Sequence, residues 1–354
     1  METNASPPFA LLIPSNAVAK LFFDATCDSG RISLDSGLIH VDAQQKYDRD
    51  VLRFRLQAEV KMQDGATESD TATDPDTETE YAMKHCGMIW SGWFCFSLEP
   101  GPCNSTRGWT IGKGRRNMDV DYLLVPPPHW DSGGLRGYHA RFNLHEKTGF
   151  LFVSKATSAA HAEVVVEGQS LTSGEQFALN RAQMSIRIGN LEFQFRYIDF
   201  AYHADFYDQR CMYMTDRLSY TTLPNINLTP TPSETFRCFG EWTMSRPLGK
   251  GAFGRVHSAT NNKGDLVAIK IVERSERTAN EVRQEVDILR TLESLTEIHE
   301  GDRKRILRLR DVIYQNGDEA YAGTVFEDVA LVLEPAVLAT FASITARLPD
   351  EKLK

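Results

Sequence analysis

Short runs in which apolar and polar residues alternate dominate the middle of this 354-residue chain. Residues 140–144 alternate in this way, and the same period of two recurs in 186–188 and 191–197, on either side of Gly189-Asn190. A period of two places successive side chains on opposite faces of a strand, and a Gly-Asn pair between two such runs predicts a tight hairpin. Because no helical period separates the runs, the pattern predicts an antiparallel β-sandwich.

The length of the chain exceeds what a single core usually supports, so a multidomain protein is expected. We expect the sandwich over residues 88–200, a proline-containing linker over 201–240 and a second domain over 241–354. Residues 1–87 are expected to form an N-terminal extension with one strand and an acidic loop, 64–80. This loop holds seven acidic residues and no basic one, and it lacks large apolar side chains, so it cannot offset the entropy of ordering its backbone.

Charge and composition limit the classes of partner. The formal net charge of −9 argues against a general affinity for nucleic acid or for an anionic membrane surface. The apolar stretches are too short to cross a bilayer and Met1 opens no signal sequence, so we expect an intracellular protein, in the nucleus or the cytoplasm. The six cysteines include no CxxC pair, and no metal site is expected.

The most specific motif is a glycine-rich run followed by a lysine. Glycines stand at 249, 251 and 254, and Val267-Ala-Ile-Lys270 follows a charged turn. Glycines let backbone N–H groups approach a phosphate without a Cβ collision, and a lysine on the next strand supplies positive charge. A dinucleotide-binding loop is excluded because that fingerprint opens a helix, whereas residues 255–260 have the pattern of a strand.

A partly desolvated lysine needs a carboxylate to orient it. Apolar residues recur at helical spacing over 278–295, where Glu281 and Glu285 lie one turn apart on the same face. Either glutamate could reach Lys270, and we prefer Glu285.

The order of these elements resembles the N-terminal lobe of a eukaryotic protein kinase, an α+β unit with an antiparallel sheet and one helix. Residues 328–336 resemble that family's fifth strand and hinge. The resemblance implies that ATP is the cofactor, that Leu333 is the gatekeeper, and that Glu334 and Ala336 bind adenine through their backbone. The rest of the adenine slot would be Leu248, Val256 and Ala268.

The resemblance covers residues 241–354 and does not include the catalytic elements. Kinases carry His-Arg-Asp, whose Asp accepts the substrate proton, and Asp-Phe-Gly, whose Asp holds Mg²⁺; neither tripeptide occurs in this sequence. Leu309-Arg310-Asp311 mimics the first, but it precedes the hinge and alternates as a strand does. We therefore assign no catalytic residue, expect weak ATP binding, and expect Mg²⁺ only if the full-length protein has a second lobe.

Loss of a second lobe would expose an apolar face, so self-association is expected. The residues expected on this face are Leu331, Leu333, Val337, Leu338, Phe341 and Ile344.

Three motifs within the sandwich, in 108–117, 137–142 and 164–168, resemble in order the forkhead-associated (FHA) family of phosphothreonine readers. The resemblance places Lys113 where an arginine grips phosphate, Arg136 where a serine does, and Ala162 near an asparagine that holds the peptide. The retained His139 is mainly structural in that family. The candidate phosphopeptide residues are Lys113, Arg115, Arg116, Arg136 and His139, and a solvated basic loop is the alternative interpretation.

Two functions remain open. An FHA-like domain joined to a kinase lobe resembles checkpoint-type serine/threonine kinases and fungal proteins of similar arrangement, and the chain would then be inactive by itself for want of the catalytic elements. The alternative is a non-catalytic, pseudokinase-like adaptor that binds phosphorylated or acidic protein partners.

Overall fold

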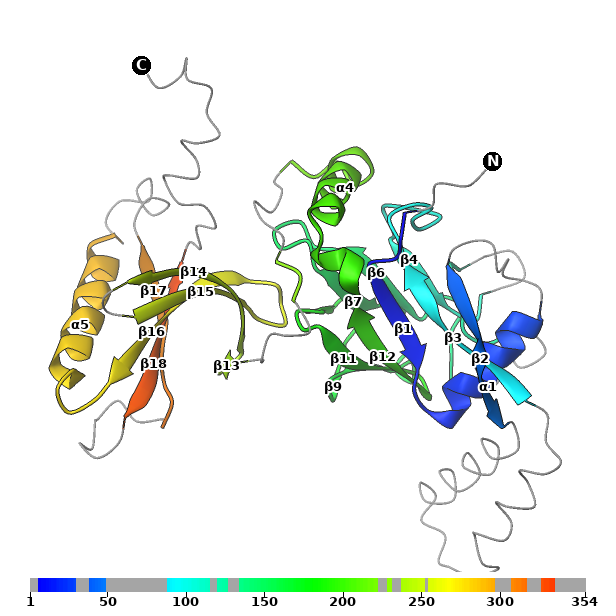
Figure 1. Ribbon diagram of the computed structural model, residues 1–354, viewed down its shortest axis with the longest axis horizontal. Helices are drawn as coiled ribbons and strands as arrows, with labels where there is room; N and C mark the ends of the chain where they lie inside the picture. The colour runs from blue at the N-terminus through cyan, green and yellow to red at the C-terminus, as the bar shows by residue number, and fades with distance from the viewer. Residues whose placement is uncertain are drawn as a thin grey trace, which may run out of the picture. The chain divides into compact units, whose positions relative to one another are not determined.

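The computed structural model describes residues 6–29, 38–48, 88–114, 120–126, 134–221, 228–230, 237–251, 254–296, 307–316 and 326–334. The chain separates into two compact units (Figure 1). The first comprises residues 1–144 and 151–220, and the second comprises residues 145–150 and 221–354. No helix in these ranges is long and apolar enough to cross a membrane.

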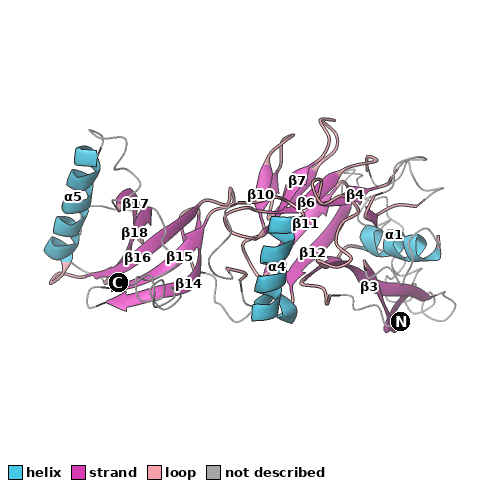
Figure 2. Cartoon of the chain, turned by 90° about the horizontal axis from the view of Figure 1, so that it is seen from above, coloured by secondary structure: helices cyan, strands magenta, loops and turns pink. Residues whose placement is uncertain are grey.

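The first unit contains two β-sheets (Figure 2). The larger sheet has, in order, β2 (Ile39–Asp48), β3 (Met88–Phe96), β1 (Ala10–Pro14), β12 (Leu191–Tyr197), β11 (Gln183–Ile188), β8 (Val164–Val166) and β9 (Gln169–Ser170). The smaller sheet has β10 (Gln176–Ala178), β7 (Leu151–Lys155), β6 (Ala140–Leu144), β4 (Trp109–Gly112) and β5 (Tyr122–Leu123). Neighbouring strands are antiparallel except for β4 and β5, which are parallel.

The core lies between these two sheets, and successive side chains along the strands alternate between the core and the outer face. Residues of β6 and β12 alternate between buried and more exposed positions, as the period of two predicts. The β11–β12 hairpin turns at Gly189, whose φ of 59° favours glycine. Aromatic rings fill the interior, including Phe9, Phe96, Trp109, Phe142 and Phe195. The predicted β-rich sandwich is confirmed.

The compact unit that contains the sandwich extends beyond residues 88–200 at both ends. Strand β1 pairs with β12 on one side and β3 on the other, and helix α1 (Ala17–Asp28) follows it with Asn16 as N-cap. A short 3-10 helix, η2 (Asp199–Tyr202), and helix α4 (Ala204–Asp216) lie in the expected linker. The expected strand before residue 64 and the acidic loop 64–80 lie outside the described residues.

Short sequence patterns account for these additional elements. β1 reads as a continuous apolar run because it is buried in the centre of a sheet. Helix α4 buries Phe206, Arg210 and Met214, which stand four residues apart on one helical face. The prolines that suggested a linker all follow this helix.

In its described residues, the second unit is a six-stranded antiparallel sheet with one helix. The strands are, in order, β13 (Cys238–Phe239), β14 (Trp242–Gly251), β15 (Gly254–Thr260), β16 (Leu266–Arg274), β18 (Glu327–Glu334) and β17 (Arg308–Tyr314). Helix α5 (Ala279–Thr296) packs Val282, Val286 and Leu289 against one face. Phe239 and Trp242 pack with residues of the other face. Because both faces are covered, β16 and β18 are nearly continuous apolar runs.

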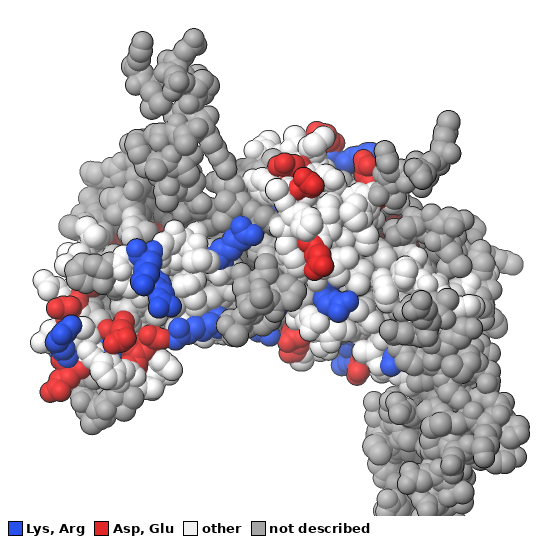
Figure 3. Space-filling view, viewed as in Figure 1, with Lys and Arg blue, Asp and Glu red and all other residues white. Residues whose placement is uncertain are grey.

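This unit has the element order expected from the sequence, including the helix over 278–295 and a strand at Leu309-Arg310-Asp311. One expectation fails: Leu331 and Leu333 are not exposed but are 0% and 5% accessible in the core beneath α5. The other four residues of the expected apolar face lie outside the described residues. Figure 3 shows basic and acidic side chains interspersed on the visible face of both units.

Candidate functional site

The strand register of the second unit aligns the glycine-rich hairpin with the lysine. Gly249 lies opposite Val256, Val256 opposite Lys270, and Lys270 opposite Leu331. Directly opposed residues of antiparallel strands project to the same face of a sheet. Leu331 belongs to the core beneath α5, so the whole row lies on the face that α5 covers.

The residues expected to line the adenine slot lie on this same face. Ala268 lies two residues before Lys270 on β16 and pairs with Leu333 of β18. Ala268 and Leu333 are both buried. Leu248 and Val256 are half-buried and pack against the same apolar cluster. Leu248 and Val256 are therefore the partly exposed members of this apolar cluster next to the lysine, and Ala268 and Leu333 lie buried within it.

The three glycines of the hairpin differ in whether the fold itself requires a glycine there. Gly254 has φ of +149°, and a Cβ there would stand 2.2 Å from the carbonyl oxygen of Ile271, so the fold itself requires glycine. At Gly249 and Gly251 a Cβ would meet no atom of the described chain within 4 Å. Packing within the described residues therefore does not explain these two glycines.

Lys270 is held by a helix carboxylate. Its Nζ donates to Oε1 of Glu285, and the two side chains are 21% and 32% exposed. Glu281, the other candidate, lies on an exposed part of α5. The structure thus selects Glu285, and the pair keeps a cation at the edge of the apolar surface while leaving it accessible to an anion.

The C-terminal end of β18 carries an ion-pair network that the sequence interpretation missed. The Glu334 carboxylate lies 3.5 Å from both Arg308 and Arg310 of β17. Arg310 also bonds Asp265 at 3.1 Å and stacks 4.9 Å from the centre of the Trp242 ring. In the sequence, the only sign of this network is the alternation of Arg308 and Arg310 along one strand. Arg310 of Leu309-Arg310-Asp311 therefore has structural partners on three other strands or turns. Ala336 lies outside the described residues.

The phosphopeptide candidates in the first unit meet at the end of β4, around His139. This side chain is fully buried; Nδ1 accepts from the N–H of Arg136 at 3.2 Å, so Nε2 donates to the Glu163 carbonyl at 2.8 Å. Burial lowers the pKa of His139. The imidazole therefore ties two loops together as a neutral ring.

Backbone bonds bring Lys113 to Arg136. The N–H of Lys113 donates to the Arg136 carbonyl at 3.0 Å, and there is no room for a Cβ at Gly112, which would lie 2.1 Å from the Gly137 carbonyl oxygen. Arg136 Nη2 lies 3.4 Å from Nδ1 of His161, a residue that the sequence interpretation did not select because one loop histidine has no pattern.

Ala162 is buried and offers no side-chain hydrogen bond to a peptide. Arg115 and Arg116 lie outside the described residues.

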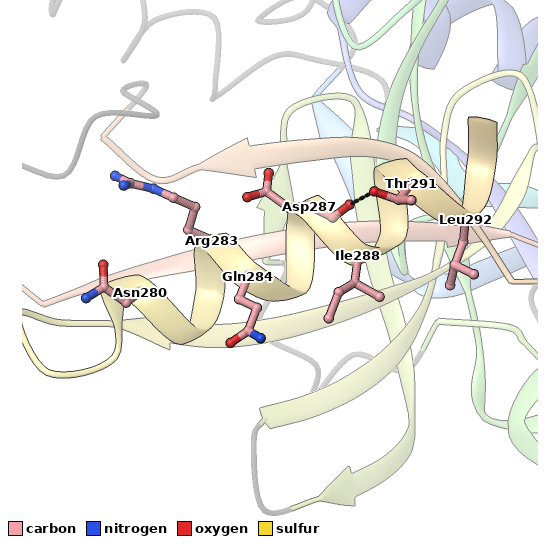
Figure 4. Close-up of a pocket in the computed structure, with 7 residues that line it drawn as sticks. All are labelled: Asn280, Arg283, Gln284, Asp287, Ile288, Thr291 and Leu292. Atoms are coloured by element: carbon pink, nitrogen blue, oxygen red, sulfur yellow. Dashed lines mark hydrogen bonds between the residues drawn. The ribbon is translucent and has the colours of Figure 1, made fainter. Parts of the chain in front are cut away.

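A cavity of about 400 Å³ lies on the exposed face of α5 and involves none of the predicted nucleotide residues (Figure 4). Gln284, Ile288 and Leu292 follow one another along its side, one turn apart. Among the described residues, no three His, Cys, Asp or Glu side chains are placed to hold a metal ion.

No protein-family model matches the chain, and no curated protein is similar to it.

Proposed function

We propose that the second unit is a nucleotide-binding lobe of the protein-kinase type and that the sandwich is an FHA-like recruitment module. One observation carries the proposal. Gly249 and Gly251, where a Cβ would meet no described atom, align on one face of the sheet with the Lys270–Glu285 pair. In protein kinases a glycine-rich loop covers the phosphates, and a lysine paired with a helix glutamate holds them.

Each group has a distinct task in this proposal. Backbone N–H groups at Gly249 and Gly251 approach the phosphates, Lys270 pairs with their charge, and Glu285 fixes the direction of the ammonium group. The adenine ring contacts the half-buried Leu248 and Val256, behind which Ala268 and Leu333 lie buried. One wall of apolar contacts buries only part of a nucleotide, so ATP is expected to bind with a Kd of about 1 mM, near −4 kcal/mol.

Phosphoryl transfer is not part of the proposed activity of these residues. The acceptor proton needs a base and Mg²⁺ needs an aspartate, and the sequence has neither His-Arg-Asp nor Asp-Phe-Gly. The kinase-type lobe is thus proposed to bind nucleotide and to present it, with Mg²⁺ held only where a second lobe supplies the ligands.

A second function, as an adaptor for phosphorylated or acidic partners, is favoured by the convergence of Lys113, Arg136 and His161 at one end of the sandwich. These groups supply positive charge, but Ala162 supplies no amide to hold a peptide backbone. We therefore propose weak, charge-driven recognition there.

Calorimetric titration with ATP tests the nucleotide proposal, with Lys270→Met as the variant and Lys263→Met as the matched control, because Lys263 is exposed in the β15–β16 turn. A charge-assisted contact contributes about 1.5–3 kcal/mol, so Lys270→Met should weaken binding at least tenfold while Lys263→Met leaves it unchanged. Equal affinities for the two variants would refute the proposal.

A further inference from the structure

The glycine-rich hairpin carries two cations that face each other across its strands. Lys250 of β14 lies directly opposite Arg255 of β15, and both residues are exposed. The neighbouring pair, Gly249 with Val256, projects to the face that α5 covers. Because successive residues of a strand project to opposite faces, Lys250 and Arg255 project to the other face of the sheet, which we call the outer face. The two cations therefore lie on the opposite side of the hairpin from the proposed nucleotide site.

The neighbours of Arg255 agree with this assignment. Arg255 pairs with Ile271 of β16, which belongs to the same apolar cluster as Phe239 on the outer face. His257 follows Arg255 by two residues on this face. Burial lowers the pKa of His257, and the charges of Arg255 and Arg237 lower it further. The imidazole is therefore neutral at pH 7, and the net charge beside the hairpin comes from the arginines and the lysine.

No carboxylate compensates the Lys250–Arg255 pair. Within the described part of the chain, neither side chain forms a hydrogen bond or an ion pair. Arg237, on the same face, is by contrast bonded to Asp328. Glu273 of β16 is exposed and is not paired with Arg255. The pair is thus an uncompensated double positive charge on an ordered strand pair.

Like charges directly opposite each other destabilise an antiparallel strand pair. Packing gives no reason for the two cations, since both residues are exposed. Cross-strand Cβ atoms lie about 5 Å apart, so both long side chains can reach one small anion between them. Such an anion replaces a repulsion with two charge-assisted contacts.

The charge of the pair favours a phosphate group over a carboxylate. A phosphate monoester carries about −1.5 to −2 charges at pH 7, so it balances both cations, whereas a carboxylate balances one. The guanidinium group of Arg255 offers parallel N–H donors to phosphate oxygens, and Lys250 adds a point charge.

We infer that Lys250 and Arg255 bind a phosphate group on the outer face of the hairpin. Its source is either inorganic phosphate or a phosphorylated residue of a partner protein. This site is distinct from the nucleotide site, which lies on the face that α5 covers.

NMR titration of the ¹⁵N-labelled full chain with sodium phosphate, against sodium chloride at equal ionic strength, tests the inference. The amide resonances of Lys250, Arg255 and His257 should shift saturably with phosphate. Lys250→Gln should weaken this binding about tenfold, because it removes one charge-assisted contact. Lys263→Gln removes an exposed lysine of the β15–β16 turn and should leave the binding unchanged. Equal binding by the two variants, or shifts that chloride reproduces, would overturn the inference.

A third variant separates this site from the nucleotide site. Lys270→Met removes the cation of the other face, so the phosphate-dependent shift at Arg255 should persist in it. Loss of that shift in Lys270→Met would show that phosphate occupies the nucleotide site, and would overturn the inference even if ATP binds as proposed.

Two peptides that differ only in phosphoserine or aspartate at one position define the ligand. The phosphoserine peptide should bind about tenfold more tightly, because its charge balances both cations. Equal affinities would contradict a phosphate site. A phosphoserine peptide that binds more tightly than inorganic phosphate supports a partner protein as the source, and one that binds more weakly supports free phosphate.

Urea denaturation without ligand gives a reading that does not depend on binding. Lys250→Gln and Arg255→Gln each remove the cross-strand repulsion, so each should raise the unfolding midpoint of the second unit at low salt, and added salt should shrink the gain. Lys263→Gln should leave the midpoint unchanged. A lower midpoint for either hairpin variant would contradict the repulsion on which the inference rests.

Discussion

Alanine substitution of the three hairpin glycines is expected to separate folding from ligand binding. At residue 254 alanine meets a positive φ, which costs about 1–3 kcal/mol in strain, and its Cβ falls 2.2 Å from the Ile271 carbonyl oxygen, which forces the strands apart. Gly249 and Gly251 offer open space and have no positive φ. Alanine there should stabilise the second unit by about 0.4–1 kcal/mol, because the unfolded chain loses conformational freedom.

Urea denaturation of the three variants measures these differences, and ATP titration measures the binding. Gly249→Ala and Gly251→Ala should each weaken ATP binding about tenfold, or 1.4 kcal/mol, since the Cβ occupies space that the phosphates need. Gly254→Ala should show the largest loss of stability. Equal destabilisation by all three substitutions, or unchanged ATP binding by Gly249→Ala and Gly251→Ala, would refute the reasoning.

Three further results are expected. Arg274 and Glu327 form a buried ion pair, 5% and 2% exposed, so Arg274→Met should destabilise the second unit by about 3–5 kcal/mol in urea denaturation, and Arg274→Met with Glu327→Leu should recover most of it; a loss below about 1 kcal/mol would contradict this. The pKa of buried His139 is lowered, so below about pH 6.5 the unfolded chain binds a proton that the folded chain does not. The stability of the sandwich should therefore fall as the pH drops below about 6.5, by up to ~1.4 kcal/mol per pH unit. His139→Gln should flatten that slope, and an unchanged slope would count against this reasoning. Phosphothreonine peptides should bind weakly and lose affinity steeply with salt, because Lys113 and Arg136 act as screened charges; salt-resistant micromolar binding that Arg136→Ala abolishes would show a rebuilt reader.

Local patterns allowed the second unit to be predicted closely. The hairpin, the lysine strand and the glutamate helix each follow from a period or a residue type within about 20 positions, and the strand pairing then places Lys270 against Glu285. The positions of Leu331 and Leu333 were predicted wrongly because their burial depends on α5, which packs on them from about 50 residues away. A tertiary contact of that kind leaves no local pattern.

In the sandwich, the strands were predictable but the limits were not. Residues of β1 pair with residues of β3 that lie 82 to 86 positions later in the chain, and the pairing of β1 with β3 and β12 makes β1 central. His161 likewise acquires meaning only when loops meet and place it beside Arg136.

The most direct measurement of the central claim is an NMR titration of the ¹⁵N-labelled chain with ATP, which reports on each backbone amide. The account predicts saturable shifts at Gly249, Gly251 and Val256 with one Kd of about 1 mM, and their loss in Lys270→Met. Resonances of the hairpin that stay unmoved up to about 10 mM ATP, ten times that Kd, or shifts confined to the sandwich, would contradict it.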